Sequence, residues 1–102
     1  ELATVQNAME SAHISEAVAS YAKRVVDASR ASSEFKLGVS TRGGVIWLRM
    51  ARAHAVLNGR DYVVPDDLQA MAETCLPHRV ILQAGVEPTT AILRLLEQVS
   101  VD

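Results

Sequence analysis

The chain has 102 residues and a hydrophobic content of 49%, a length typical of one domain with a single core. Its ten basic and twelve acidic residues give a net charge of −2, which argues against a general binder of nucleic acid or anionic membranes, since such proteins normally carry a basic excess. It has no run of about 18 apolar residues, so the sequence predicts no membrane-spanning segment.

The first thirty residues predict two helices. A short one is expected before residue 12, because apolar residues there recur at spacings of three and four. The chain begins at Glu1 inside this pattern, so we expect it to be a piece of a longer protein. Ser15 is a plausible N-cap for a helix over 15–30, whose apolar face consists of Val18, Tyr21, Val25 and Ala28.

Residues 31–37 are expected to form a loop, and Ser40 to start a central helix over 41–58 that ends at Asn58-Gly59. Trp47 and Leu57 are both expected in the core, so Leu57→Ala should cost about 2–5 kcal/mol. The predicted core stripe of this helix is Ile46, Met50, Ala53 and Leu57, widened by Trp47 and Ala51.

Residues 62–64 should be a short extended piece before a third helix over 65–75. Pro65 suits its first position, and Asp66 and Asp67 are favourable near its positive end. Residues 80–82 could be a short strand or an extended link, and Pro88 opens a last helix over 88–99. The expected fold class is therefore all-α.

The candidate functional residue is Arg42, in the first turn of the central helix. A helix N-terminus gathers backbone N–H groups and positive dipole, and an arginine there suits a phosphate. By pattern alone, an ordinary surface arginine remains the favoured alternative. Gly43 and Gly44 are costly inside a helix, so another chain or subdomain could require the bare backbone.

Arg49 and Arg52 share a helical face with Arg42, and Arg60 lies just beyond the helix. The group could form a phosphate-facing stripe or a DNA-recognition helix, but for Arg49 and Arg52 a solvated face is the favoured interpretation.

Cys75 and His78 have the spacing of half a zinc site, but no second pair follows. We predict a buried, inert Cys75, no metal site, and a reducing compartment for a chain with one cysteine. His54 is expected in the core or at its boundary. The sequence contains no phosphate-binding G-x-x-x-x-G-K-[ST] loop and no apolar run ending in Asp-Glu, so we expect no nucleotide hydrolysis by these residues alone.

Two segments resemble the lid subdomain of MoxR-type AAA+ ATPases: Gly38-Val39-Ser40-Thr41-Arg42 and, about twenty residues later, Gly59-Arg60-Asp61-Tyr62-Val63-Val64-Pro65-Asp66-Asp67. Pro77-His78-Arg79 is similar to a third family segment. The resemblance implies that residues 1–102 form a small four-helix AAA+ lid-type bundle with a short N-terminal helix, separated from its nucleotide-binding core. Thr41, Gly43 and Val64 depart from the family's usual Pro, Ala and Thr, and Val64 removes a side-chain N-cap.

In this resemblance Arg42 matches the sensor 2 arginine, which reads the γ-phosphate of ATP. The implied parent is a cytoplasmic, chaperone-like ATPase that uses ATP and Mg²⁺, neither bound by this fragment alone. Its implied partners are its own AAA+ core, neighbouring subunits of a usually hexameric ring and von Willebrand A-domain proteins, without nucleic acid or membrane insertion. Two alternatives stay open: a freestanding helical protein-interaction module, and a DNA-binding domain using Arg42, Arg49, Arg52 and Arg60.

Overall fold

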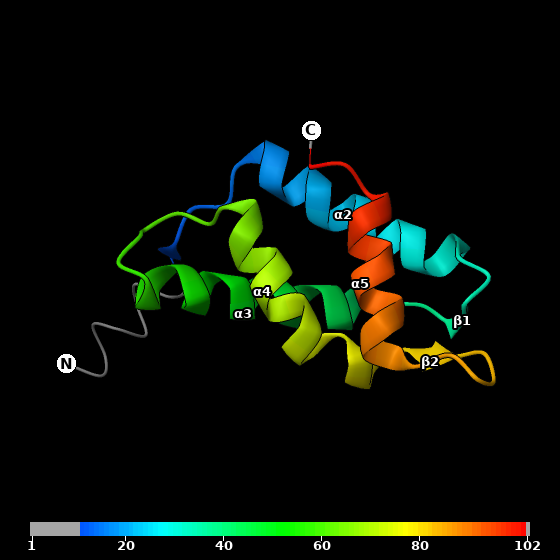
Figure 1. The fold of residues 1–102 in the computed structure, drawn as a ribbon. Helices are drawn as coiled ribbons and strands as arrows, with labels where there is room; N and C mark the ends of the chain where they lie inside the picture. The colour runs from blue at the N-terminus through cyan, green and yellow to red at the C-terminus, as the bar shows by residue number, and fades with distance from the viewer. Residues whose placement is uncertain (1–10, 102) are drawn as a thin grey trace.

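The fold is described for residues 11–101 of a computed structural model, and the short helix predicted before residue 12 falls almost wholly outside that range. Helices dominate, which confirms the all-α class (Figure 1). The elements, in chain order, are α2 (Glu16–Ala31), β1 (Phe35–Leu37), α3 (Thr41–Leu57), α4 (Pro65–Cys75), the 3₁₀ turn η1 (Pro77–Arg79), β2 (Ile81–Leu82) and α5 (Pro88–Gln98).

The helices start where the local signals predicted. Ser15 caps α2, with its Oγ accepting a hydrogen bond from the Val18 N–H at 3.2 Å. Pro65 and Pro88 are the first residues of α4 and α5. The Glu87 carboxylate caps α5 and accepts hydrogen bonds from the N–H groups of Thr89 and Thr90 at 3.0 and 2.9 Å. These caps satisfy backbone donors that the helices themselves leave unpaired.

A small antiparallel sheet joins two loops that are distant in sequence. Phe35 pairs with Leu82 and Leu37 with Ile81, so residues 80–82 contribute a strand, one of the two predicted alternatives. The loop predicted for residues 31–37 is wrong at its end, because β1 forms there. A three-residue strand has no periodicity of its own, and this one exists through its partner far along the chain.

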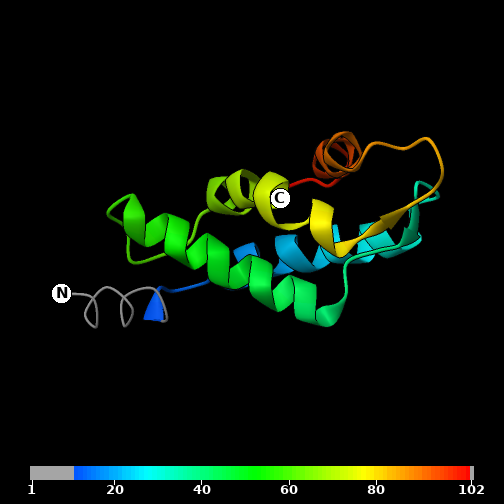
Figure 2. The ribbon, with the colours of Figure 1, turned by 90° about the horizontal axis from the view of Figure 1, so that it is seen from below.

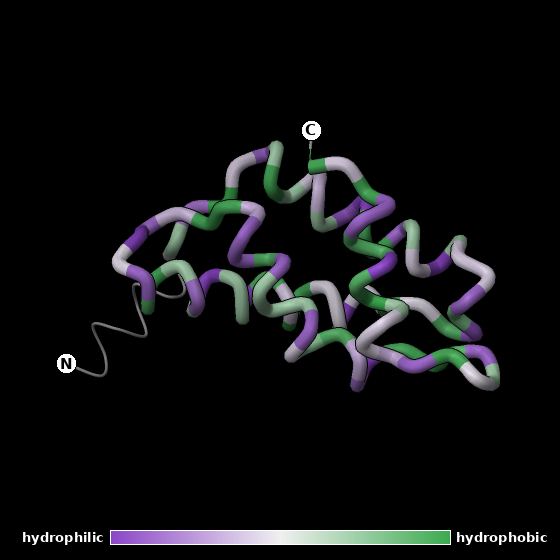
Figure 3. Tube along the Cα trace, in the orientation of Figure 1, coloured by the Kyte–Doolittle hydropathy of each residue, from purple (hydrophilic) through white to green (hydrophobic). Residues whose placement is uncertain are grey.

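Trp47 lies at the centre of the hydrophobic core. Its side chain is fully buried, and its indole Nε1 donates a hydrogen bond to the Leu68 carbonyl of α4 at 2.9 Å. Figure 3 shows hydrophobic and hydrophilic residues alternating along the helices, as expected where each helix buries one face. Every described α-helix contributes to the core, including Tyr21 and Val25 of α2, Leu68 and Ala72 of α4, and Ile92 and Leu95 of α5.

The predicted core stripe of α3 is confirmed at Trp47 and Ala51, which are buried, and wrong at Met50 and Leu57. The buried residues are Gly43, Trp47, Ala51 and Ala55. Met50 is exposed and Leu57 is 74% exposed, so the large cost predicted for Leu57→Ala does not follow from this structure. Apolar residues lie all round α3, and periodicity therefore could not select the face. Packing against α4, its most extensive neighbour, selects the small alanines instead of the larger side chains.

The two ends of α3 lie in different surroundings (Figure 2). Its N-terminal end faces the side of the molecule that carries β1 and β2, and its C-terminal end meets the turn into α4. At that second end, residues 62–64 are extended as predicted: the Val63 N–H donates to the His13 carbonyl at 2.8 Å. None of the helices in residues 11–101 is long and apolar enough to cross a membrane.

Candidate functional site

The N-terminal turn of α3 is built by Ser40, as the sequence predicted. Its backbone is extended, with φ −76° and ψ 166°, and its Oγ accepts a hydrogen bond from the Gly43 N–H at 3.0 Å. The Ser40 carbonyl accepts from the Gly44 N–H at 2.9 Å and begins the helical pattern. The cap satisfies one of the free donors of the turn and leaves the positive end of the helix dipole facing outward.

Arg42 lies on this first turn, and its side chain is exposed. No hydrogen bond or ion pair involves Arg42 among residues 11–101. The first turn of α3 contains no acidic residue, whereas Glu16 stands in the first turn of α2 and Asp66 and Asp67 in that of α4. An uncompensated guanidinium at the positive end of a helix can receive an anion in a bidentate contact.

The glycines after Arg42 have different surroundings. A Cβ built on Gly43 would lie 3.2 Å from Cγ1 of Val39 and 3.6 Å from Cδ of Arg79, so the first of these contacts would be tight. A Cβ on Gly44 would meet only Cγ2 of Val26, at an ordinary 3.6 Å. Within the described residues, it is thus Val39 of the same chain that approaches the bare backbone at Gly43.

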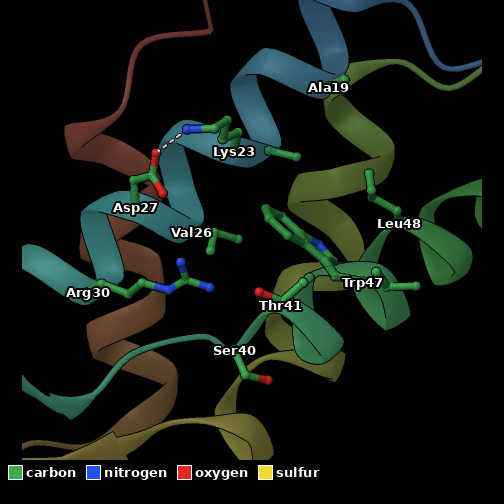
Figure 4. Close-up of a pocket in the computed structure, with 12 residues that line it drawn as sticks. Ala19, Lys23, Val26, Asp27, Arg30, Ser40, Thr41, Trp47 and Leu48 are labelled. Atoms are coloured by element: carbon green, nitrogen blue, oxygen red, sulfur yellow. Dashed lines mark hydrogen bonds and ion pairs between the residues drawn. The ribbon is translucent and has the colours of Figure 1, made fainter.

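An apolar groove of about 300 Å³ runs between α2 and α3 beside this turn. Trp47 and Val26 line its wall, as Figure 4 shows, and Lys23 and Asp27 form an ion pair at its edge with an Nζ–Oδ2 distance of 2.9 Å. The Arg30 side chain extends from α2 toward Thr41. The groove places α2 side chains next to the first turn of α3.

The other arginines of the predicted stripe do not share the surroundings of Arg42. Arg49 is exposed, whereas Arg52 is partly buried. Arg60 forms a bidentate ion pair with Asp67, in which its two terminal nitrogens donate to the two carboxylate oxygens at 2.6 and 2.8 Å. The four arginines therefore do not form one exposed stripe.

Asp67 is the centre of a buried polar network that sequence analysis missed. Its side chain is 0% exposed, and besides Arg60 it accepts hydrogen bonds from the Val64 N–H at 2.8 Å and pairs with Nδ1 of His54 at 2.7 Å. Burial alone would raise the pKa of Asp67, but the hydrogen bonds from Arg60, Val64 and His54 outweigh it and lower the pKa to about 2.

This network explains how α4 starts without a side-chain cap at Val64. The Asp67 carboxylate reaches back to the Val64 N–H, and the Asp67 N–H donates to the Val64 carbonyl at 2.9 Å. His54 lies at the edge of the core, as predicted, with 32% of its side chain exposed. The available signal was an arginine just after one helix and an aspartate just inside the next, across a short turn.

Cys75 and His78 are in different surroundings. Cys75 is buried, as predicted, and His78 is exposed. Within residues 11–101 there is no group of three or more His, Cys, Asp or Glu side chains that could hold a metal ion.

Comparison with known proteins identifies relatives of the whole chain. It is 30% identical to the uncharacterized protein YeaC of Bacillus subtilis over 95% of this chain and 32% of that protein. It is 27% identical to the chaperone MoxR1 of Mycobacterium tuberculosis over 98% of this chain and 30% of that protein. The chain spans about a third of the length of these relatives.

A crystal structure assigned as an ATPase from Cytophaga hutchinsonii has the same fold. It superposes with a TM-score of 0.85 at 31% identity, covering 92% of this chain and 33% of that one. The family model described as the AAA lid domain matches residues 27–96, which include α3 and α4 in full. The chain therefore belongs to the AAA lid domain family and is a lid of the MoxR type.

Proposed function

We propose that this chain is the nucleotide-sensing lid of a MoxR-like AAA+ ATPase and that Arg42 is its sensor 2 arginine. The observation that carries the proposal is the exposed guanidinium on a capped helical turn that contains no carboxylate. Such a turn is suited to an anion that comes from outside the described residues.

The γ-phosphate of ATP fits this turn chemically. A guanidinium donates two parallel hydrogen bonds to phosphate oxygens, and the helix dipole adds positive potential at the same place. Bound ATP would supply the phosphoryl group that this arginine faces. Mg²⁺ would be held by the core domain, together with the rest of the nucleotide.

Sensing follows from a difference between two states. Arg42 would contact the γ-phosphate while ATP is intact and lose that contact after hydrolysis and phosphate release. Because the contact favours one orientation of the lid, its loss shifts the population to another. The lid would in this way convert the chemical state of the nucleotide into movement.

The wider assignment extends the same proposal. The 102 residues would act as the lid of a cytoplasmic ATPase with a separate nucleotide-binding core, in a ring of six or a similar number of subunits. Similarity to the chaperone MoxR1 supports a chaperone-like motor. Von Willebrand A-domain proteins would be its partners. Because Arg60 is paired with Asp67, one of the four arginines on which DNA binding would depend is not available to DNA. This pairing favours nucleotide sensing over DNA binding.

The test is ATP turnover in the full-length ATPase. Arg42→Ala should lower turnover by at least about tenfold, less than the roughly 10³-fold or more that an arginine acting directly on the transferred phosphoryl group contributes, because a sensing arginine acts less directly. Arg42→Lys should restore part of the rate, because lysine keeps the charge but loses the planar fork. Arg49→Ala is the matched control, since it removes an exposed arginine two turns along the same helix.

Parental turnover in Arg42→Ala would show the sensor assignment to be wrong. An equal loss in Arg49→Ala would also contradict it, because the whole face would then matter and Arg42 would have no special role.

A further inference from the structure

The segment that leads into α3 is fastened to the last turn of α2 through the backbone of Val39. Oγ of Ser29 accepts a hydrogen bond from the Val39 N–H at 2.9 Å and donates to the Val26 carbonyl at 2.6 Å. Nε of Arg30 donates to the Val39 carbonyl at 2.9 Å. Two side chains of α2 thus form hydrogen bonds with both the N–H and the carbonyl of Val39.

Gly38 brings the two backbones together. A Cβ at this position would lie 2.7 Å from the Arg30 nitrogen, 2.7 Å from the Ser29 carbonyl carbon and 2.8 Å from its oxygen. These distances are below van der Waals contact, and the opposing atoms are backbone atoms that cannot rotate away. Only glycine allows the segment to lie this close to α2.

Burial makes this arrangement specific. Ser29 and Val39 are both 0% exposed, and Ser29 is one of the few polar residues buried in the described structure. A buried N–H that loses its partner costs about 1–3 kcal/mol, so few other arrangements of the segment are accessible. Val39 is followed directly by the N-cap Ser40, and Arg42 is only three positions away. The contacts of Val39 therefore set the position from which Arg42 extends.

We propose that Ser29 and Arg30 are positioning residues for Arg42. They hold the start of α3 against α2, so that the Arg42 guanidinium and the last turn of α2 move as one unit. This inference rests on the proposed sensing function and adds that α2 takes part in nucleotide sensing without touching the nucleotide.

The experiment measures kcat for ATP in the full-length ATPase carrying Ser29→Ala, Arg42→Ala or both. Ser29→Ala changes no charge, so any loss comes from geometry. A catalytic or sensing group that is slightly misplaced loses much of its effect, and we expect kcat to fall by about tenfold. In the Arg42→Ala background, the same change should produce no further loss, since there is no guanidinium left to position.

Ser15→Ala is the matched control. It removes an N-capping serine at the opposite end of the same helix and should cost about 1 kcal/mol of stability. Parental turnover in this variant, together with the loss in Ser29→Ala, separates positioning from general destabilisation. If Ser29→Ala does not fold, Arg30→Ala takes its place in the same cycle, because Arg30 is exposed and its removal leaves Ser29 intact.

Three results would overturn the inference: parental turnover in Ser29→Ala, losses that multiply with that of Arg42→Ala, or an equal loss in Ser15→Ala. These outcomes leave the sensor assignment standing as long as Arg42→Ala lowers turnover. If Arg42→Ala itself has the parental rate, the proposed function fails and the positioning role fails with it.

Discussion

The two ends of α3 are held in different ways. At the C-terminal end, the buried carboxylate of Asp67 joins His54 of α3, Arg60 of the turn and the start of α4 in one ionic network. At the N-terminal end, neutral backbone groups of Val39 are held by α2, and the charge of Arg42 has no partner among residues 11–101. The Asp67 carboxylate at the C-terminal end is paired inside the molecule, whereas the Arg42 guanidinium at the N-terminal end is exposed.

This difference separates a structural end from a functional one. Removing either partner of a buried, hydrogen-bonded ion pair destabilises the fold strongly, because the other charge is left buried without a partner. An exposed arginine at a helix N-terminus adds nothing to the core and is unfavourable toward the helix dipole. Its presence is explained if the favourable partner is a ligand. The predictions below test this contrast, beginning with the largest expected effect.

Asp67→Ala should be the most destabilising change at the structural end. It leaves Arg60, His54 and the Val64 N–H without their buried acceptor, and we expect a loss of about 3 kcal/mol in the free energy of unfolding. Urea denaturation of the 102-residue chain measures it. The control is Glu34→Ala, which removes the partner of Arg94 from a surface ion pair and should cost less than about 1 kcal/mol. Similar losses in the two variants would contradict the structural role of the network.

The dependence of the free energy of unfolding on pH that Asp67 causes should be a smaller effect than that of Asp67→Ala. The pKa of Asp67 is lowered from 3.8 to about 2, so its contribution is complete above the unfolded value and is lost as pH falls through the folded value. It amounts to about 2 kcal/mol. The stability difference between the parent and Asp67→Asn should thus shrink as pH falls from about 4 toward 2. A difference that stays constant down to pH 2 would mean that the carboxylate is not held in its charged form.

Gly44→Ala should have the smallest effect on the free energy of unfolding, and it should stabilise the chain where the other changes destabilise it. The position is helical and its Cβ would meet only Val26 at 3.6 Å, so alanine should stabilise the chain by about 0.5–1 kcal/mol. Gly43→Ala is the comparison, and the tight contact with Val39 should cancel its gain. Thermal unfolding of both variants distinguishes them. A destabilised Gly44→Ala would mean that the groove beside α3 is more tightly packed than this structure has it.

Local signals in the sequence predicted much of this fold. Ser15, Ser40, Pro65 and Pro88 each marked a helix start by chemistry that acts within one turn, and the structure confirms all four. The buried face of α3 could be predicted only in part: Trp47 and Ala51 are buried as expected, but apolar residues surround the helix and tertiary packing chose between the others. Leu57 shows the consequence, since it matched the stripe and lies exposed.

The functional region was predictable only in part. The position of Arg42 on the first turn followed from the Ser40 cap. The contacts of Ser29 depend on residues brought together by folding and have no local pattern, whereas the Asp67 network left only a weak one, an arginine and an aspartate on either side of a short turn. Asp67 read as an ordinary first-turn carboxylate, yet it is fully buried. Whether a first-turn aspartate lies on the surface or in the core depends on the residues that tertiary structure packs around it.

The most direct test of nucleotide sensing is the distance between lid and core in the two nucleotide states. One spin label would replace the exposed Glu73 of α4 and a second would be placed on the core of the full-length ATPase. Pulsed dipolar spectroscopy should give two different distance distributions with a non-hydrolysable ATP analogue and with ADP. In Arg42→Ala both states should give the ADP distribution, whereas Arg49→Ala should behave as the parent. An Arg42→Ala protein that keeps the parental shift between the two states would contradict the claim that the lid senses nucleotide through Arg42.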